Sequence, residues 1–164
     1  MRTLKKILLV AFILVLLIGG FFIYIKVTPP LVTGTIFKGQ DHHTVVIAIG
    51  NKGIGDLEIT SVKVNNHADP NEIKIQVSNV LVGFAGTIDE NSVAASHIQY
   101  FNIEDISIPK GTIPEELLKK FDEGSATEKD TIYGLTVNHH EDIHNVHIKY
   151  RYLGILFNET VVLD

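Results

Sequence analysis

The sequence predicts a mainly β protein: an antiparallel β-sandwich with one short helical insertion, preceded by a single N-terminal transmembrane helix. Three observations support this fold class. An uninterrupted apolar run extends from Ile7 to Ile25, short β segments alternate with turn residues through positions 31–164, and one segment near Pro114 carries the start and stop signals of a helix.

The apolar run is long enough to cross a membrane. Its 19 residues would span roughly 28 Å at about 1.5 Å per residue, close to the hydrocarbon thickness of about 30 Å. A basic tail (residues 1–6) precedes it, and a linker (residues 26–30) that ends in two prolines follows it. The positive-inside rule therefore predicts a signal-anchor with a cytoplasmic N-terminus and an extracytoplasmic C-terminal domain.

A cleaved secretory signal is the alternative interpretation, because it also combines a basic and an apolar region. The apolar region of such a signal covers about 7–15 residues and ends in a small-x-small cleavage site. The run in this chain is longer, and no such site follows Ile25. An uncleaved single-pass anchor in the cell membrane is therefore the prediction.

The chain beyond the anchor is acidic. Four of the 14 Lys and Arg residues lie in the first 26 positions, which leaves ten basic residues against all 19 acidic ones, a net charge of −9. Such a domain does not attract nucleic acid or anionic lipid headgroups. The chain also has no cysteine. Because small exported eukaryotic domains usually depend on disulfides, this absence favours a bacterial cell envelope.

Eight segments of the exported part have the character of β-strands bounded by Gly, Asn, Asp and Pro. They are residues 31–37, 44–49, 57–65, 73–84, 98–108, 131–138, 144–153 and 156–163. Seven or eight strands in one domain, residues 31–164, predict a two-sheet antiparallel sandwich. In the third and fourth segments the alternation of apolar residues shifts by one position, which predicts a β-bulge or a bend in each.

Residues 112–121 break the β pattern. Pro114 occupies a first-turn position, acidic residues come early, lysines come late and Gly124 lies just beyond. These boundary signals predict a helix of about two turns, with Leu117, Leu118 and Phe121 on its apolar side. The helix either packs on the sandwich or presents an amphipathic face to a partner.

The stretch VVIAIGNKG, followed by LEITSVKVN, resembles the strand–Asn-x-Gly–strand opening of immunoglobulin-like, cell-adhesion-related modules of bacterial surface proteins. Modules of that family are generally binding or spacer units without catalytic residues. The resemblance therefore implies an immunoglobulin-like sandwich with an interaction or structural role. It transfers no functional residue to this chain.

The sequence contains no convincing catalytic or cofactor-binding motif. The run GNKGIGD lacks the spacing of a phosphate-binding loop, no G-x-S-x-G elbow occurs, and the absence of cysteine removes thiol nucleophiles. Ser96 and His97 are adjacent, but neighbours on a strand point to opposite faces and do not form a catalytic pair. We therefore predict that the protein is not an enzyme and has no cofactor.

Half of the eight histidines lie in the stretch VNHHEDIHNVHIKY, residues 137–150. We interpret this stretch as a β-hairpin with Glu141 and Asp142 at its tip. The hairpin register places His139 opposite His144, where paired Cβ atoms lie about 4.5–5.5 Å apart, and His147 on the other face. His139 and His144 are therefore candidate ligands for zinc or copper, to which an acidic tip residue or residues 41–43 could contribute. A pH-sensitive tip and a plain polar turn are the alternatives.

Taken together, these features predict a membrane-anchored, non-catalytic module of the cell envelope, which acts by binding another envelope protein or by structural support. The alternative is an envelope metal-binding protein that uses His139 and His144.

Overall fold

A computed structural model describes residues 2–39, 42–86 and 97–163 of the chain, which divides into two units, Met1–Pro30 and Leu31–Asp164. The first unit consists mainly of α1 (Arg2–Val27). Within it, the segment Lys5–Val27 is long and apolar enough to cross a membrane. The large apolar side chains from Ile7 to Ile23 are exposed all around the helix, whereas a helix of a soluble core buries at least one stripe. The predicted apolar helix is confirmed.

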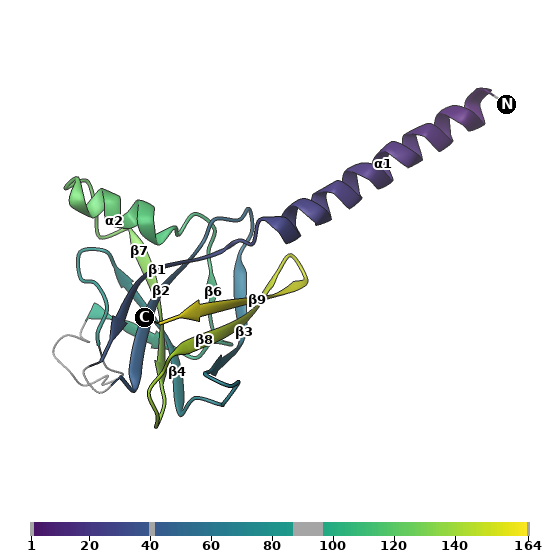
Figure 1. The fold of residues 1–164 in the computed structure, drawn as a ribbon. Helices are drawn as coiled ribbons and strands as arrows, with labels where there is room; N and C mark the ends of the chain where they lie inside the picture. The colour runs from purple at the N-terminus through teal and green to yellow at the C-terminus, as the bar shows by residue number, and fades with distance from the viewer. Residues whose placement is uncertain (1, 40–41, 87–96, 164) are drawn as a thin grey trace. The chain divides into compact units, whose positions relative to one another are not determined.

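The second unit is an antiparallel β-sandwich of two sheets (Figure 1). Sheet A has the strand order β1-β2-β7-β4-β5, and sheet B has the order β6-β3-β8-β9. In chain order the strands are β1 (Leu31–Lys38), β2 (Thr44–Asn51), β3 (Leu57–Val64), β4 (Glu72–Asn79), β5 (Gln99–Phe101), β6 (Ser107–Ile108), β7 (Thr131–Asn138), β8 (Asn145–Tyr152) and β9 (Ile155–Val162). The predicted β-sandwich behind one N-terminal helix is therefore confirmed.

The hydrophobic core lies between the two sheets. On sheet A, Leu135 of β7 pairs with Ile47 on one side and Ile75 on the other, and all three side chains are fully buried. On sheet B, β8 alternates buried and accessible residues along its whole length, as a strand with one solvated face does. Burying a large aliphatic side chain contributes about 1.5–3 kcal/mol. This layer therefore provides most of the driving force for folding.

The two predicted shifts in strand alternation have different outcomes. In β3 the pairing with β8 shifts between Ile59 and Ser61, which confirms the bulge. The fourth predicted segment was too long, because β4 ends at Asn79. The side-chain oxygen of Asn79 accepts hydrogen bonds from the N–H groups of Leu81 and Val82, at 2.9 and 3.2 Å. The apolar residues 80–84 therefore belong to a loop.

The predicted strand 98–108 is also corrected. It forms two short strands, β5 and β6, which lie at the edges of different sheets. A turn over residues 103–105 separates them, and the N–H of Asp105 donates to the carbonyl of Asn102. The chain changes sheet within a segment that has the composition of one strand.

The outer face of sheet A is covered where β2 runs, because all eight residues of β2 are buried. The predicted helix, α2 (Pro114–Asp122), covers part of this face, with Leu117 buried beneath it. The loop of residues 80–86 covers another part. It is held by Gln76, a fully buried residue whose side chain exchanges hydrogen bonds with the backbone of Ala85, at 2.8 and 2.9 Å.

Two glycines permit these covering segments to approach the sheet. A Cβ atom at Gly50 would lie 1.8 Å from the carbonyl oxygen of Thr112, and one at Gly134 would lie 2.8 Å from the ring of Phe84. Real Cβ atoms do not tolerate such distances, so only glycine fits at both positions.

A two-residue turn joins β8 to β9, because Tyr152 pairs directly with Ile155. The turn residues Leu153 and Gly154 have φ angles of 48° and 78°. Positive φ at both positions is the signature of a type I′ turn, which favours Asn-Gly. A left-handed conformation costs a residue such as leucine about 1–2 kcal/mol.

We expect Leu153→Asn to raise the free energy of unfolding by about 0.5–1 kcal/mol, because asparagine tolerates this conformation. Urea denaturation followed by tyrosine fluorescence measures the change, since the chain has no tryptophan. The matched control is Leu156→Asn, at another exposed leucine that lies in β9, which should give no gain. Equal gains in both variants, or none in Leu153→Asn, would contradict the turn assignment.

Asp130 fixes the connection between α2 and β7. Its carboxylate accepts a hydrogen bond from Lys120 Nζ at 2.6 Å, and bonds from the backbone N–H and the hydroxyl of Thr127 at 2.8 Å each. The bond from Lys120, followed by those from Thr127, lowers the pKa of Asp130 from 3.8 to about 2. The folded state therefore favours the ionised carboxylate.

Because the pKa of Asp130 is lower in the folded than in the unfolded chain, its stabilising effect is complete above about pH 4 and is lost as the pH falls towards 2. We expect Asp130→Asn to be less stable than the wild type at pH 7, and this difference to shrink between pH 4 and pH 2. Urea denaturation at a series of pH values tests this. Asp122→Asn, at an exposed carboxylate near the end of α2, should show no such pH-dependent difference.

Candidate functional site

The predicted hairpin of residues 137–150 is wrong. β7 lies in sheet A between β2 and β4, whereas β8 lies in sheet B between β3 and β9. Both edges of β7 are occupied by other strands of its own sheet, so no edge is left for β8. Residues 139–144 instead carry the chain from one sheet to the other.

This crossing, residues 139–144, places the two predicted metal ligands in different environments. His139 is 3% exposed, while His144 is exposed and its backbone N–H donates to the side-chain oxygen of Asn65, at 2.8 Å. Because β7 and β8 lie in different sheets, the strand pairing that the hairpin register required is absent. The pairing of His139 with His144 therefore loses its geometric basis.

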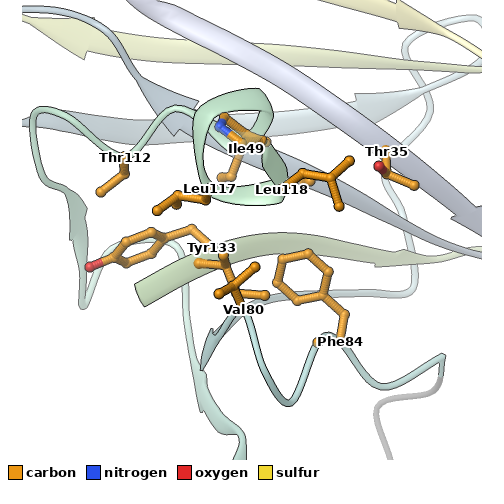
Figure 2. Close-up of a pocket in the computed structure, with 12 residues that line it drawn as sticks. Thr35, Ile49, Val80, Phe84, Thr112, Leu117, Leu118 and Tyr133 are labelled. Atoms are coloured by element: carbon orange, nitrogen blue, oxygen red, sulfur yellow. The ribbon is translucent and has the colours of Figure 1, made fainter. Parts of the chain in front are cut away.

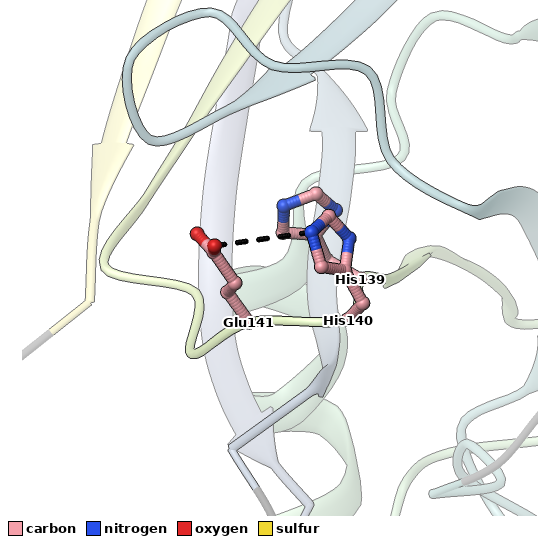
Figure 3. A group of neighbouring side chains, drawn as sticks. All are labelled: His139, His140 and Glu141. Carbon is pink, nitrogen blue, oxygen red and sulfur yellow. Dashed lines mark ion pairs between the residues drawn. The ribbon is translucent and has the colours of Figure 1, made fainter.

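A different group of side chains gathers around His139. One ligand atom from each of His139, His140 and Glu141 lies within 4.8 Å of the others. The two imidazole rings have centroids 4.2 Å apart, and His140 Nε2 lies 3.8 Å from Glu141 Oε1. Figure 3 shows the two rings overlapping, with the Glu141 carboxylate to one side of them. We call these three residues the His-His-Glu cluster.

The fold also brings the loop between β1 and β2 to this crossing. The backbone N–H groups of His139 and Ile143 donate to the carbonyls of His43 and His42, at 2.9 and 3.1 Å. The imidazole of His43 lies 3.5 Å from the carboxylate of Asp142. Residues 42 and 43 therefore lie beside residues 139–143, through backbone bonds that sequence spacing does not reveal, while Asp41 lies outside the described residues.

His147 belongs to a separate pair. Its ring stacks on that of His67 with centroids 4.2 Å apart, and its Nε2 lies 2.8 Å from the carbonyl oxygen of Asn65. Its Nδ1 lies 3.0 Å from the hydroxyl of Thr160. Both ring nitrogens of His147 therefore have protein partners, which explains this histidine by structure alone.

A second candidate site is an apolar groove of about 180 Å³ on the outer face of sheet A. Leu117 and Leu118 of α2 lie on one side of it, and Val80, Phe84 and Tyr133 lie on the other (Figure 2). The remaining lining residues are Thr35, Ala48, Ile49, Gly83, Thr112, Pro114 and Ile132. Burial raises the pKa of Tyr133, with a smaller contribution from the charge of Asp56, so its phenol stays neutral at physiological pH.

Large apolar side chains are also exposed on the two segments, α2 and the loop of residues 80–86, that contribute residues to this groove. Leu118 and Phe121 of α2 are 47% and 48% exposed, and Leu81 and Val82 of the covering loop are 49% and 43% exposed. The predicted apolar side of the helix is therefore divided between Leu117, which packs on the sheet, and two residues that face solvent. We call these four exposed residues the groove rim.

Sequence reasoning did not find the groove, because it lies between segments that are far apart in the chain. The only available signal was Asn79 followed by Gly83, which marks residues 80–86 as a turn instead of a strand. Ser96 and His97 were predicted not to form a catalytic pair. Ser96 lies outside the described residues, and His97 is exposed.

Comparisons with known proteins do not assign a family. No protein-family model, no curated protein and no solved structure matches this chain significantly.

Proposed function

We propose that the chain is a single-pass membrane protein whose β-sandwich lies outside the cytoplasm and serves as a non-catalytic interaction module of the cell envelope. The apolar helix Lys5–Val27 supports the membrane anchor, and the observation that carries the interaction role is the apolar groove with its exposed rim. An apolar concave surface beside exposed large apolar residues is characteristic of interaction sites. Covering such a surface with a partner is favourable in proportion to the apolar area removed from water.

The size of the groove indicates what it receives. Sites for small organic ligands usually enclose about 300–1,000 Å³, whereas this groove encloses about 180 Å³. That volume suits one or two large side chains. We therefore propose that an apolar anchor residue of an envelope protein partner enters the groove, while the groove rim excludes water around it.

The strand order supports a binding or spacer role. The orders β1-β2-β7-β4 and β3-β8-β9 correspond to A-B-E-D and C-F-G of constant-type immunoglobulin domains, with β5 and β6 as additional edge strands. This agreement favours the immunoglobulin-like assignment. Fold alone does not define a function, so the assignment adds support and the groove carries the argument.

We expect a photo-crosslinking amino acid at Leu118 to form one discrete adduct in intact cells, because this position lies beside the proposed anchor. A crosslinker at Leu156, which is 57% exposed in β9, is the matched control and should form none. Electrophoresis and mass spectrometry identify the adduct.

A second variant makes this experiment specific for the groove. Leu81→Asp on the groove rim should reduce the yield at Leu118 by about tenfold, which corresponds to roughly 1.4 kcal/mol of binding free energy. Leu153→Asp, at an exposed leucine in the β8–β9 turn, should leave the yield unchanged. The proposal fails if Leu156 crosslinks as well as Leu118, or if Leu118 gives no adduct.

The proposed orientation is tested separately. Because the chain has no cysteine, an introduced cysteine is the only thiol that a maleimide can label. We expect Leu156→Cys to react in intact cells with a maleimide that does not cross membranes, whereas Thr3→Cys should react only after lysis. Labelling of Thr3→Cys in intact cells with protection of Leu156→Cys would reverse the orientation. Mature protein that begins near Val27 in N-terminal sequencing would instead identify the apolar helix as part of a cleaved signal.

A further inference from the structure

We propose that the His-His-Glu cluster, which consists of His139, His140 and Glu141, binds one divalent transition-metal ion. The proposal replaces the predicted partner of His139, which was His144, by two residues that the crossing places beside it. It is independent of the groove, which shares no residue with the cluster.

The first observation is geometric. The three ligand atoms already lie within 4.8 Å of one another, and ligands of a tetrahedral zinc site lie about 3.4 Å apart when each bond is about 2.0–2.1 Å long. His140 and Glu141 are exposed, so their side chains can close this small gap by rotation. The backbone of His139 is meanwhile held by its bond to the carbonyl of His43.

The second observation is independent of the first. His139 is 3% exposed, and among the described residues its Nδ1 has no hydrogen-bond partner. A buried polar atom without a partner costs about 1–3 kcal/mol. Bound ions are one established reason why such atoms occur in native proteins. Coordination of a metal ion through Nδ1 of His139 would give this buried atom the partner that it lacks.

A neighbouring residue orients the second ligand. The side-chain oxygen of Asn71 lies 3.4 Å from Nδ1 of His140. If Nδ1 carries the proton and donates it to this oxygen, Nε2 has a free lone pair, and Nε2 is the nitrogen that lies 3.8 Å from Glu141. A hydrogen bond of this kind, from the ring nitrogen that does not bind the metal to a neighbouring side chain, fixes the tautomer of metal-binding histidines.

The donor set defines the class of ion. Two imidazoles and one carboxylate suit Zn²⁺, Cu²⁺ or Ni²⁺, whereas Ca²⁺ and Mg²⁺ require mostly oxygen ligands. Three protein ligands leave one coordination position for water or for a donor from another molecule. The cluster therefore resembles an open metal site, which keeps one position for another ligand, and not a structural site with four protein ligands.

The experiment uses the full chain, purified in detergent without a histidine tag and freed of metal by a chelator. We expect calorimetric titration with Zn²⁺ to give saturable binding of one ion per chain. His140→Ala and Glu141→Gln change exposed side chains, and each should weaken binding by about tenfold or more. The matched controls, His144→Ala and His147→Ala, should bind as the wild type does. Absence of saturable binding, or unchanged binding by His140→Ala, overturns the proposal.

Participation of His139 is tested without replacing this buried residue. In the Cu²⁺ complex we expect electron paramagnetic resonance to detect two coordinated imidazole nitrogens in the wild type and one in His140→Ala. Two nitrogens in that variant, or none, would assign the copper to other residues and overturn the proposed ligand set. Neither result bears on the groove, because the crosslinking experiment is performed on different residues.

Discussion

β2 is buried along its whole length, and the rest of the domain is arranged around this constraint. Its inner residues pack between the two sheets, as in any sandwich, but Val46 and Ala48 on the opposite face also need protection from water. Residues 80–86 and α2 supply that protection as a partial third layer. Because two separate segments share the task, a gap remains between them, and this gap is the apolar groove.

The elements that the sequence predicted well are those defined by local patterns. Turn residues bound β1, β2 and β7, and the proline, acidic residues and lysines around residues 112–124 define α2. The end of β4 was predicted too late in the chain, because apolar residues suit both the buried face of a strand and a loop that covers a sheet. Residues 80–84 continue the composition of β4, and only their tertiary position, held by Gln76, distinguishes the two roles.

The failed hairpin has a similar cause. Two adjacent segments with a consistent register favour a hairpin, but local pattern does not show that β2 and β4 already occupy both edges of β7. The burial of the two strands in the structure shows the difference that the local pattern did not reveal. β7 has a run of five buried residues, whereas β8 alternates, and these are the patterns of a strand covered on both faces and a strand with one solvated face. Strands of such different character do not belong to the same exposed hairpin.

The crossing that replaced the hairpin also explains why the His-His-Glu cluster exists. A segment that leaves one sheet for the other must pass from a buried to an exposed environment within a few residues, so consecutive side chains meet different surroundings. His139 is held inside, while His140 and Glu141 reach solvent beside it. The cluster lies near the start of β2 and the groove near its end. About six residues at roughly 3.3 Å each separate His43 from Ile49, a distance of about 20 Å. An ion at one end therefore leaves the groove at the other end free for a partner.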